Sequence, residues 1–222
     1  EERVDLVVHS LKDLPTEEPG GLEIIAIPER AEPADLLLAG PGLLRDPPAN
    51  PFNLPRGSVL GTSSLRRAAQ ALARNPEIDI RALRGNVPTR VRKLQDGEFD
   101  AILLAAAGVR RLGLDLGELG ARELTPEEML PAPGQGALAS ETRAGDPATA
   151  CLKRLHDEKV AECVAAERGL LEMLGGGCHL PLGALAVEDP GGLRLQAVLG
   201  EIDDQATRAE IARVGSVAQD SR

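Results

Sequence analysis

Three strand-like segments alternate with three helix-like segments between residues 58 and 111, and this alternation constrains the fold more than any other feature. Thr62, Ser63 and Ser64 follow the first strand and suit the N-cap of a helix. Asn86 suits the N-cap of the next helix, with Pro88 in its first turn. Because a helix is the usual crossover between parallel strands, the pattern predicts a parallel α/β layer. The expected strands are 58–61, 78–82 and 99–104, the expected helices are 65–74, 87–96 and one that begins near 105, and two earlier strands are expected at 22–27 and 36–39.

The rest of the chain predicts further parts around this layer. The segments 31–35 and 130–138 are interrupted by proline or glycine and are typical of crossings between domains. Asp157 suits the N-cap of a long helix that ends at Gly175, and strands follow from Leu180, as in a small α+β domain. We therefore expect domain 1 at 1–32 and 133–155, domain 2 at 33–132, and domain 3 at 156–222.

Residues 4–8, VDLVV, are apolar enough to predict a strand that is buried on both faces. His9, Ser10, Lys12 and Asp13 follow its carboxyl end, which is where ligands bind in open α/β sheets. A carboxylate, a cation and a hydroxyl could handle protons on a substrate there, although a solvated turn is the simpler interpretation of these residues alone. We expect the histidine to be packed or hydrogen-bonded at the strand end. A buried strand so near the first residue indicates that the N-terminal part of domain 1 lies outside this sequence.

Composition argues against several classes of protein. The net charge is -10, and the chain has no Trp or Tyr and only two Phe, so neither the charge nor the aromatic side chains suit nucleic acid. The longest apolar run, 101–109, is too short to cross a bilayer and no secretory signal is evident, so the cytosol is the expected location. Only four of the 25 basic residues are Lys. Codon usage could explain that excess of Arg, but Arg is also the side chain that binds carboxylates bidentately.

Arginines follow three successive strands of the predicted layer. Arg66 and Arg67 lie in the first turn of a helix, where backbone N–H groups attract anions and where a cation is unfavourable for the helix itself. Arg84 and Arg90 lie near the start of the next helix, and Arg111 follows the third strand. Together they predict a site for a polycarboxylate or a polyphosphate, and solvated surface arginines are the alternative. The sequence has neither G-x-x-x-x-G-K-[ST] nor G-x-G-x-x-G, which weighs against a nucleotide.

The three cysteines are too widely spaced for a C-x-x-C metal or redox site. We expect Cys151 and Cys163 to be buried helix residues. Cys178 stands in the glycine-rich stretch GGGCHLPLG, where a sulfur would be accessible and the backbone could approach a bulky group. A lone cysteine in a loop is usually inert, so this stretch alone does not identify a function.

Six motifs occur in a fixed order between residues 4 and 186: VVHSLKDLP, GTSSLRR, RGNVPTR, DAILLAAAGVRRLGL, LPAPGQGA and GGGCHLPLGALA. Together they resemble the hydroxymethylbilane synthase family, whose members are also called porphobilinogen deaminases. The resemblance implies two α/β domains like those of type II periplasmic binding proteins, and a small α+β C-terminal domain. It also implies a dipyrromethane cofactor joined by a thioether to Cys178. The implied reaction condenses porphobilinogen head to tail with loss of ammonia, and gives linear hydroxymethylbilane for haem and related tetrapyrroles.

The resemblance also implies roles for individual residues. Asp13 would be the catalytic residue, because a fixed carboxylate can stabilise the cationic azafulvene that remains when ammonia leaves. Arginines would neutralise the acetate and propionate groups of the rings. No metal is implied, and the expected state is a cytoplasmic monomer. The implied cofactor-binding residues are Cys178, Ser10, Lys12, Thr62, Ser64, Arg66, Arg67, Arg84, Asn86 and Gly108, and the implied substrate-binding residues are Arg90, Arg111 and Gln135.

Two features depart from the family pattern, and two other classes of protein stay open. An N-terminal segment with further arginines and a mobile loop, and a last helix after Gly215, are not evident. A non-catalytic carboxylate-binding protein of periplasmic-binding-protein-like fold would have no use for Cys178 or Asp13. A phosphate-handling α/β enzyme would fit GTSSLRR but would leave the glycine-cysteine stretch unexplained.

Overall fold

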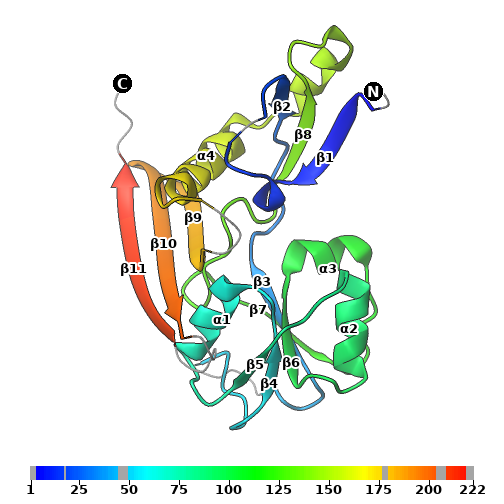
Figure 1. Cartoon of the computed structure of the whole chain (residues 1–222), viewed down its shortest axis with the longest axis vertical. Helices are drawn as coiled ribbons and strands as arrows, with labels where there is room; N and C mark the ends of the chain where they lie inside the picture. Colours follow the sequence, from blue (N-terminus) through cyan, green and yellow to red (C-terminus); the bar gives the residue numbers. More distant parts are fainter. Residues whose placement is uncertain (1–3, 18, 45–49, 177–179, 204–208, 219–222) are drawn as a thin grey trace.

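The computed structural model describes residues 4–17, 19–44, 50–176, 180–203 and 209–218. These residues form three sheets (Figure 1). The chain passes from the sheet near its N-terminus to the five-stranded sheet and later returns to the first sheet. Within the described ranges, no helix has the length and apolar character needed to cross a membrane.

The middle of the chain forms a five-stranded sheet with three helices: β3 (Asp35–Ala39), β4 (Val59–Gly61), α1 (Leu65–Leu72), β5 (Asp79–Arg81), α2 (Val87–Gln95), β6 (Ala101–Ala105), α3 (Ala106–Leu112) and β7 (Gly120–Glu123). The strand order is β5-β4-β6-β3-β7. β4 is parallel to β5 and to β6, and a helix follows each of these three strands, which confirms the predicted alternation. β3 runs antiparallel to both of its neighbours, so the sheet is mixed rather than purely parallel.

The predicted N-caps of α1 and α2 are confirmed. Ser64 Oγ accepts a hydrogen bond from the Arg67 N–H at 3.4 Å, and Asn86 Oδ1 accepts one from the Thr89 N–H at 2.9 Å. These bonds satisfy backbone donors that the first turn of a helix leaves unpaired. The cap of α1 therefore fixes where that helix begins, and with it the positions of Arg66 and Arg67.

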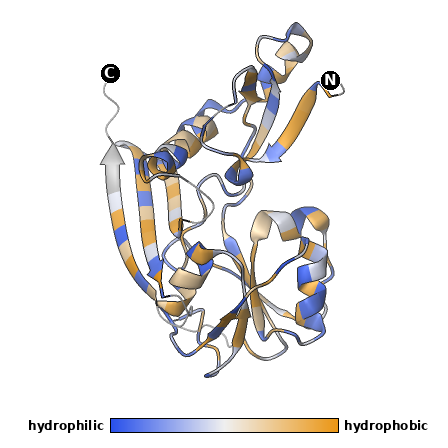
Figure 2. Cartoon of the chain, viewed as in Figure 1, coloured by the Kyte–Doolittle hydropathy of each residue, from blue (hydrophilic) through white to orange (hydrophobic). Residues whose placement is uncertain are grey.

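Both faces of the five-stranded sheet are buried. Leu37 of β3 packs on one face with Leu72 of α1. Leu38, the next residue in β3, packs on the other face with Val91 of α2. Figure 2 shows hydrophobic residues along the central strands and hydrophilic residues on α2. Consecutive apolar residues in these strands are thus explained by helices on both sides.

The strand predicted at 4–8 forms two residues later and includes His9 and Ser10, which were expected after its end, and the prediction that it is buried on both faces is wrong. It belongs to an antiparallel sheet, ordered β1-β8-β2, of β1 (Leu6–Ser10), β2 (Leu22–Ala26) and β8 (Leu138–Arg143). Within the described residues β1 has one neighbouring strand, β8, and Val7 and Val8 are 43% and 58% exposed. The expected hydrogen bond of His9 is confirmed, because its Nε2 lies 3.1 Å from Glu141 Oε2 on β8.

The last part of the chain is a small α+β unit, as predicted. A 3-10 stretch, η2 (Pro147–Leu155), leads into α4 (Glu158–Met173), and the antiparallel strands β9 (Leu182–Asp189), β10 (Gly192–Ile202) and β11 (Ala209–Ala218) follow. Asp157 Oδ1 accepts a hydrogen bond from the Val160 N–H at 3.2 Å, which confirms the predicted N-cap. The proposed domain boundaries near residues 32, 132 and 155 fall between the sheets.

This unit packs against both other parts of the chain (Figure 1). Val164 of α4 joins a buried cluster with Leu11 and Ala139 of the three-stranded sheet region. On the other side β10 lies against α1, and Gly200 permits the approach, because a Cβ there would lie 2.5 Å from the Cβ of Ala69. The α+β unit therefore fixes α1 and the β1 region relative to one another.

Candidate ligand-binding site

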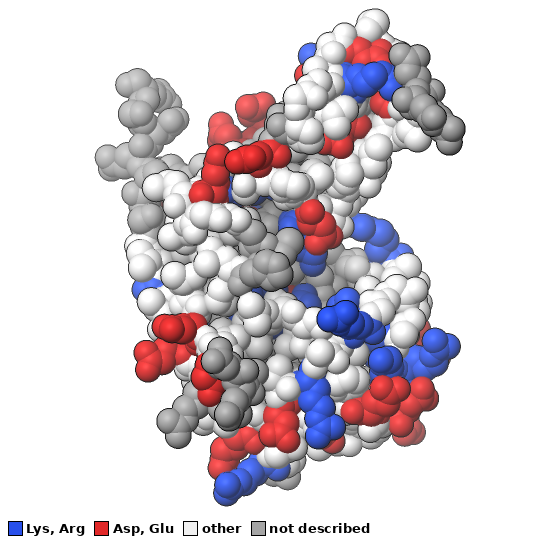
Figure 3. Space-filling model, viewed as in Figure 1, with Lys and Arg blue, Asp and Glu red and all other residues white. Residues whose placement is uncertain are grey.

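A cavity of about 770 Å³ lies among the three parts of the chain. Its walls come from residues 12–17 after β1, from the start of α1, from the crossing segment 132–135, and from the end of α4 with the start of β9. In Figure 3 a hollow with Lys and Arg side chains around it separates the upper and lower parts of this face. A cavity of this size suits a small organic ligand.

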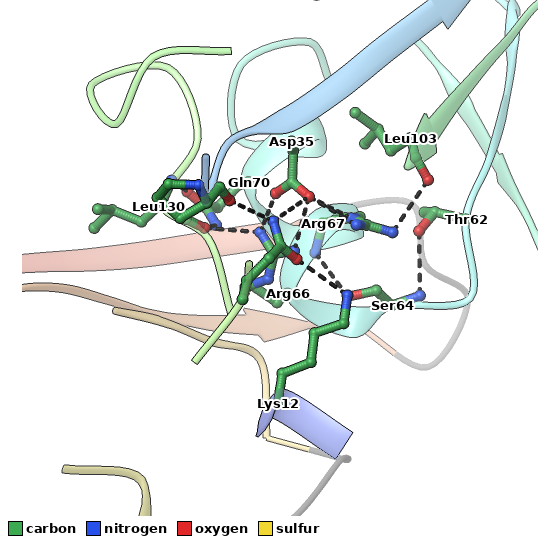
Figure 4. Close-up of polar contacts among 11 residues, drawn as sticks. Lys12, Asp35, Thr62, Ser64, Arg66, Arg67, Gln70, Leu103 and Leu130 are labelled. Atoms are coloured by element: carbon green, nitrogen blue, oxygen red, sulfur yellow. Dashed lines mark hydrogen bonds and ion pairs between the residues drawn. The ribbon is translucent and has the colours of Figure 1, made fainter. Parts of the chain in front are cut away.

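Two arginines of α1 converge on one buried carboxylate, that of Asp35 at the start of β3 (Figure 4). Arg66 Nη1 donates to Asp35 Oδ2 at 2.6 Å, and Arg67 Nη2 donates to Asp35 Oδ1 at 2.7 Å. All three side chains are buried. An anion does lie between the two arginines, as their placement in the sequence suggests, and the protein itself provides one.

The electrostatics of this cluster keep all three groups charged. Burial alone would raise the pKa of Asp35, but the charges of Arg66 and Arg67 outweigh it and hold that pKa well below its usual range. Burial lowers the pKa of Arg66, while the charge of Asp35 opposes that shift. A guanidinium stays protonated in proteins, so the cluster has two positive charges against one negative charge.

Gln135, which is fully buried in the crossing segment, links this cluster to the cavity. Its Nε2 donates to Pro33 O at 2.7 Å and to Asp35 Oδ1 at 3.0 Å. Its Oε1 accepts a hydrogen bond from Lys12 Nζ at 3.3 Å. Burial, followed by the charge of Arg67, lowers the pKa of Lys12 to about 8, so this ammonium stays mostly protonated at neutral pH. A third cation therefore faces the same cavity.

One buried donor of the cluster, Arg66 Nε, has no hydrogen-bond partner among the described residues. Arg66 also lines the cavity. A buried donor without an acceptor costs free energy, so such groups normally have a partner. The cluster therefore fits a ligand that brings a carboxylate or another oxygen acceptor to this wall.

A second buried carboxylate, that of Glu167 on α4, holds the crossing segments. Arg30 Nη1 and Nη2 donate to its two oxygens at 2.7 and 3.0 Å. The backbone N–H groups of Gly134 and Ala186 donate to the same carboxylate at 2.7 and 2.9 Å. Glu167 thus joins both crossings to α4 and β9.

Sequence reasoning missed both buried carboxylates. Asp35 directly precedes the apolar strand Leu36–Ala39, and Glu167 lies on the helical face of Val160 and Val164. An acidic residue at a position where the pattern predicts burial is a signal, because a buried charge is normally paired. The partners of these two carboxylates are distant in sequence and are not evident from it.

The chain matches two family models, "Porphobilinogen deaminase, dipyromethane cofactor binding domain" over residues 1–170 and "Porphobilinogen deaminase, C-terminal domain" over residues 161–221. It belongs to the porphobilinogen deaminase family. The relative from Oceanobacillus iheyensis is 44% identical over 214 residues, which cover 96% of this chain and 67% of that protein. The relative from Thermus thermophilus is 50% identical over 212 residues, which cover 94% of this chain and 67% of that protein. The chain therefore spans about two thirds of the length of these porphobilinogen deaminases.

Membership confirms the fold class and the cofactor that the resemblance implies for a porphobilinogen deaminase. Among solved structures, the substrate binding protein of an amino acid ABC transporter is 13% identical and has a TM-score of 0.38, with 78% of this chain and 67% of that chain covered. A superposition this loose carries no information about the site.

Six of the residues expected in a porphobilinogen deaminase site line the cavity: Lys12, Asp13, Ser64, Arg66, Arg67 and Gln135. Thr62 lies just behind this wall, where it is buried and its Oγ1 accepts a hydrogen bond from the Ser64 N–H at 3.2 Å. Cys178 lies outside the described residues. Gly176 and Leu180, which are described on either side of it, both line the cavity.

The other expected residues do not line the cavity: Ser10, Arg84, Asn86, Arg90, Gly108 and Arg111. Arg90 Nε donates to Gly85 O at 2.7 Å. Burial lowers the pKa of Arg90, and the charge of Arg67 lowers it further, so these two guanidinium groups lie near enough to interact. The arginine clusters at successive strand ends are therefore only partly brought together, and the roles of the outlying ones stay predictions.

Of the two cysteines predicted to be buried helix residues, one is buried and one is exposed. Cys163 is buried on α4, as predicted. Cys151 is exposed, and the prediction that it is a buried helix residue is wrong. It lies in η2, a 3-10 stretch in which only Thr149 is buried. The described residues contain no group of His, Cys, Asp or Glu that could hold a metal ion.

Proposed function

We propose that this chain is a hydroxymethylbilane synthase, which condenses porphobilinogen head to tail, releases ammonia and gives linear hydroxymethylbilane. The observation that carries the proposal is a single cavity, in a member of this family, that combines the carboxylate of Asp13 with the cations Lys12, Arg66 and Arg67. Porphobilinogen has acetate and propionate groups, so cations are needed to bind it and a carboxylate is needed for the charge that develops.

The residues present fit a dipyrromethane attached through Cys178. Such a group has ring carboxylates, and the buried Arg66 Nε is a donor that lacks an acceptor among the described residues. Lys12 and Ser64 line the same cavity, as do Gly176 and Leu180 next to the proposed attachment point. When bound, the group supplies the pyrrole to which new rings are joined. In this proposal Arg66 and Lys12 hold its carboxylates.

The charges of the wall would bind carboxylates selectively over neutral groups. Arg66 and Arg67 exceed the charge of Asp35 by one, and Lys12 adds another cation beside them. The carboxylate of Asp35 accepts hydrogen bonds from two nitrogens of Arg66 and two nitrogens of Arg67, and so orients both guanidinium planes. The arginines are therefore held in place before a ligand arrives, which reduces the entropy that binding must remove.

Asp13 is the residue we propose for the chemistry. It lies in the 3-10 turn η1 (Leu11–Asp13) and is one of the residues that line the cavity. Loss of ammonia from porphobilinogen leaves a cation, and a carboxylate held beside it stabilises that charge in the transition state. The same carboxylate can accept and return a proton of the pyrrole ring.

Replacing Asp13 with Asn is therefore expected to leave the fold and the cofactor adduct intact and to lower turnover by roughly a hundredfold, the low end for loss of a positioned charge in a transition state. Steady-state rates of porphobilinogen consumption measure this. Asp115→Asn is a matched control, because Asp115 is exposed and, among the described residues, its Oδ1 accepts only a local hydrogen bond, from the Gly117 N–H at 2.9 Å. Turnover within a factor of a few of the original chain in Asp13→Asn would remove Asp13 from the mechanism.

The function itself is tested on the unmodified chain by two measurements. Intact mass should exceed the polypeptide mass by that of two linked pyrrole rings, and incubation with porphobilinogen should release ammonia and yield hydroxymethylbilane. A non-catalytic carboxylate-binding protein of the same fold would bind porphobilinogen without either result, and a phosphate-handling enzyme would have no adduct. The absence of both the adduct and the product would overturn the proposal.

We further propose that the chain acts as a monomer in the cytoplasm, with porphobilinogen as its small-molecule partner and with no nucleic-acid or membrane partner. The net charge of -10 and the lack of Trp and Tyr support the absence of a nucleic-acid partner.

A further inference from the structure

One arginine of α4 is bonded to the turn that carries Lys12 and Asp13. Arg168 Nη1 donates to the backbone carbonyls of Leu11 and Leu14, at 3.1 and 3.2 Å. Its Nη2 donates to Pro15 O at 2.6 Å. A guanidinium has several donors in a fixed plane, and here they converge on three carbonyls within five residues.

The turn η1 is a single short turn of 3-10 helix, three residues long. Its backbone bonds include one from Leu14 N–H to Leu11 O at 3.2 Å, and Leu11 N–H donates to Ala137 O of the neighbouring strand region at 3.0 Å. A 3-10 turn of three residues has poor hydrogen-bond geometry, and the carbonyls that follow it have no partner inside the turn. Arg168 donates to two of these, Leu14 O and Pro15 O, and adds a second donor for Leu11 O.

The side chains of α4 hold this turn by two kinds of contact. Leu11 is fully buried and packs with Val164, which lies one helical turn before Arg168 and on the same face of α4. Glu167, the residue before Arg168, binds Arg30 and Gly134 of the crossing segments. Successive residues of one helix thus hold the turn with Asp13 and the segment with Gln135 in fixed relation.

We propose that Arg168 is a positioning residue for the condensation reaction, and that it acts by holding η1 so that the side chains of Lys12 and Asp13 face the cavity. The inference rests on the proposed function and extends it to a residue that does not line the cavity. A displacement of reacting groups by about 1 Å can cost on the order of a hundredfold in rate, so a residue that bonds this short turn at three carbonyls can control the rate.

The experiment compares Arg168→Gln and Arg168→Lys with the unmodified holoenzyme. Arg168→Gln should lower kcat by about tenfold to a hundredfold, with little change in KM, and should keep the cofactor adduct on intact mass. Arg168→Lys should recover part of the loss, because an ammonium can reach some of the three carbonyls but lacks the planar fork. Arg154→Gln is the matched control, because Arg154 is exposed and, within the part of the chain that the structure describes, donates only to Cys151 O in its own segment.

Two further measurements separate positioning from a general loss of structure. Amide hydrogen exchange should become faster in a peptide that spans residues 11–16 and should stay unchanged in β10 of the Gln variant. If Arg168 acts through Asp13, the double variant Asp13→Asn with Arg168→Gln should be about as slow as Asp13→Asn alone. Additive losses in the double variant, or an unchanged kcat or local exchange in Arg168→Gln, would overturn the positioning role. An inactive unmodified chain would overturn the proposed function instead, and with it the role assigned to Arg168.

Discussion

Replacing Cys178 with Ala is expected to give a folded protein that has no cofactor adduct and no measurable turnover. The thioether proposed at this sulfur would be the covalent link that retains the dipyrromethane, and Gly176 and Leu180 on either side of Cys178 line the cavity. Intact mass should therefore equal that of the polypeptide, and the colour reaction of linked pyrroles with acidic aldehyde reagents should be lost. The melting temperature should also fall, because a bound group stabilises only the folded state.

The other two cysteines are the controls for Cys178→Ala. Cys151 is exposed in η2 and Cys163 is buried on α4. Neither lines the cavity, so neither is expected to hold the cofactor. Cys151→Ala and Cys163→Ala should both keep the adduct and the activity, and only the second should lose stability, through packing on α4. An adduct found on Cys151 or Cys163, or turnover by a protein with no adduct, would refute the attachment at Cys178.

The α/β layer could be predicted from the sequence because its determinants are local. A run such as 101–105 is apolar at consecutive positions, and Ser64 and Asn86 cap the helices that follow their strands through bonds within three residues of the chain. Both kinds of signal depend on neighbours in sequence, which a pattern contains. The direction of β3 is not local, since it depends on which strand it pairs with, and the pattern did not predict it.

Burial was predicted less well where it depends on what covers a segment. The sequence of β1 is as apolar as that of a core strand, yet Val8 is 58% exposed, because β1 lies at the edge of its sheet among the described residues. The prediction that Cys151 is buried failed for a similar reason, since η2 is a 3-10 stretch with few buried positions. Composition gives the preference of a segment for burial, but only the fold decides whether a partner is present.

The candidate site also has some features that could be predicted from the sequence and others that could not. Its cations and Asp13 could be predicted, because charged residues follow strand ends in the sequence. The partners that hold those residues could not, because Asp35 is 31 residues from Arg66, and Arg30 is 137 residues from Glu167. The sequence therefore predicted several of the residues that line the cavity but not which buried carboxylates keep them in place.

Replacing Asp35 with Asn is expected to destabilise the protein by about 3–5 kcal/mol, the usual cost of removing one partner from a buried ion pair. Arg66 and Arg67 would remain buried with no opposing charge, and Gln135 would lose an acceptor at 3.0 Å. Urea unfolding at pH 7 measures the change in the free energy of unfolding. The cofactor should also be retained less well, because Arg66 Nη1 and Arg67 Nη2 lose the carboxylate that orients them.

The control for Asp35→Asn is Asp100→Asn in the same part of the chain. Asp100 Oδ2 accepts one hydrogen bond, from the Val59 N–H at 2.7 Å, and an Asn oxygen can still accept it, so the cost should be about 1 kcal/mol or less. The two variants should also differ in their dependence on pH. The pKa of Asp35 is depressed in the folded state, so its stabilisation is complete above about pH 4, the ordinary pKa of an aspartate in an unfolded chain, and is lost as pH falls below that value. The stability gap between Asp35→Asn and the unmodified chain should therefore narrow only in acid. A gap below about 1 kcal/mol at pH 7 would mean that water or a ligand oxygen compensates Arg66 and Arg67, and that Asp35 does not hold them.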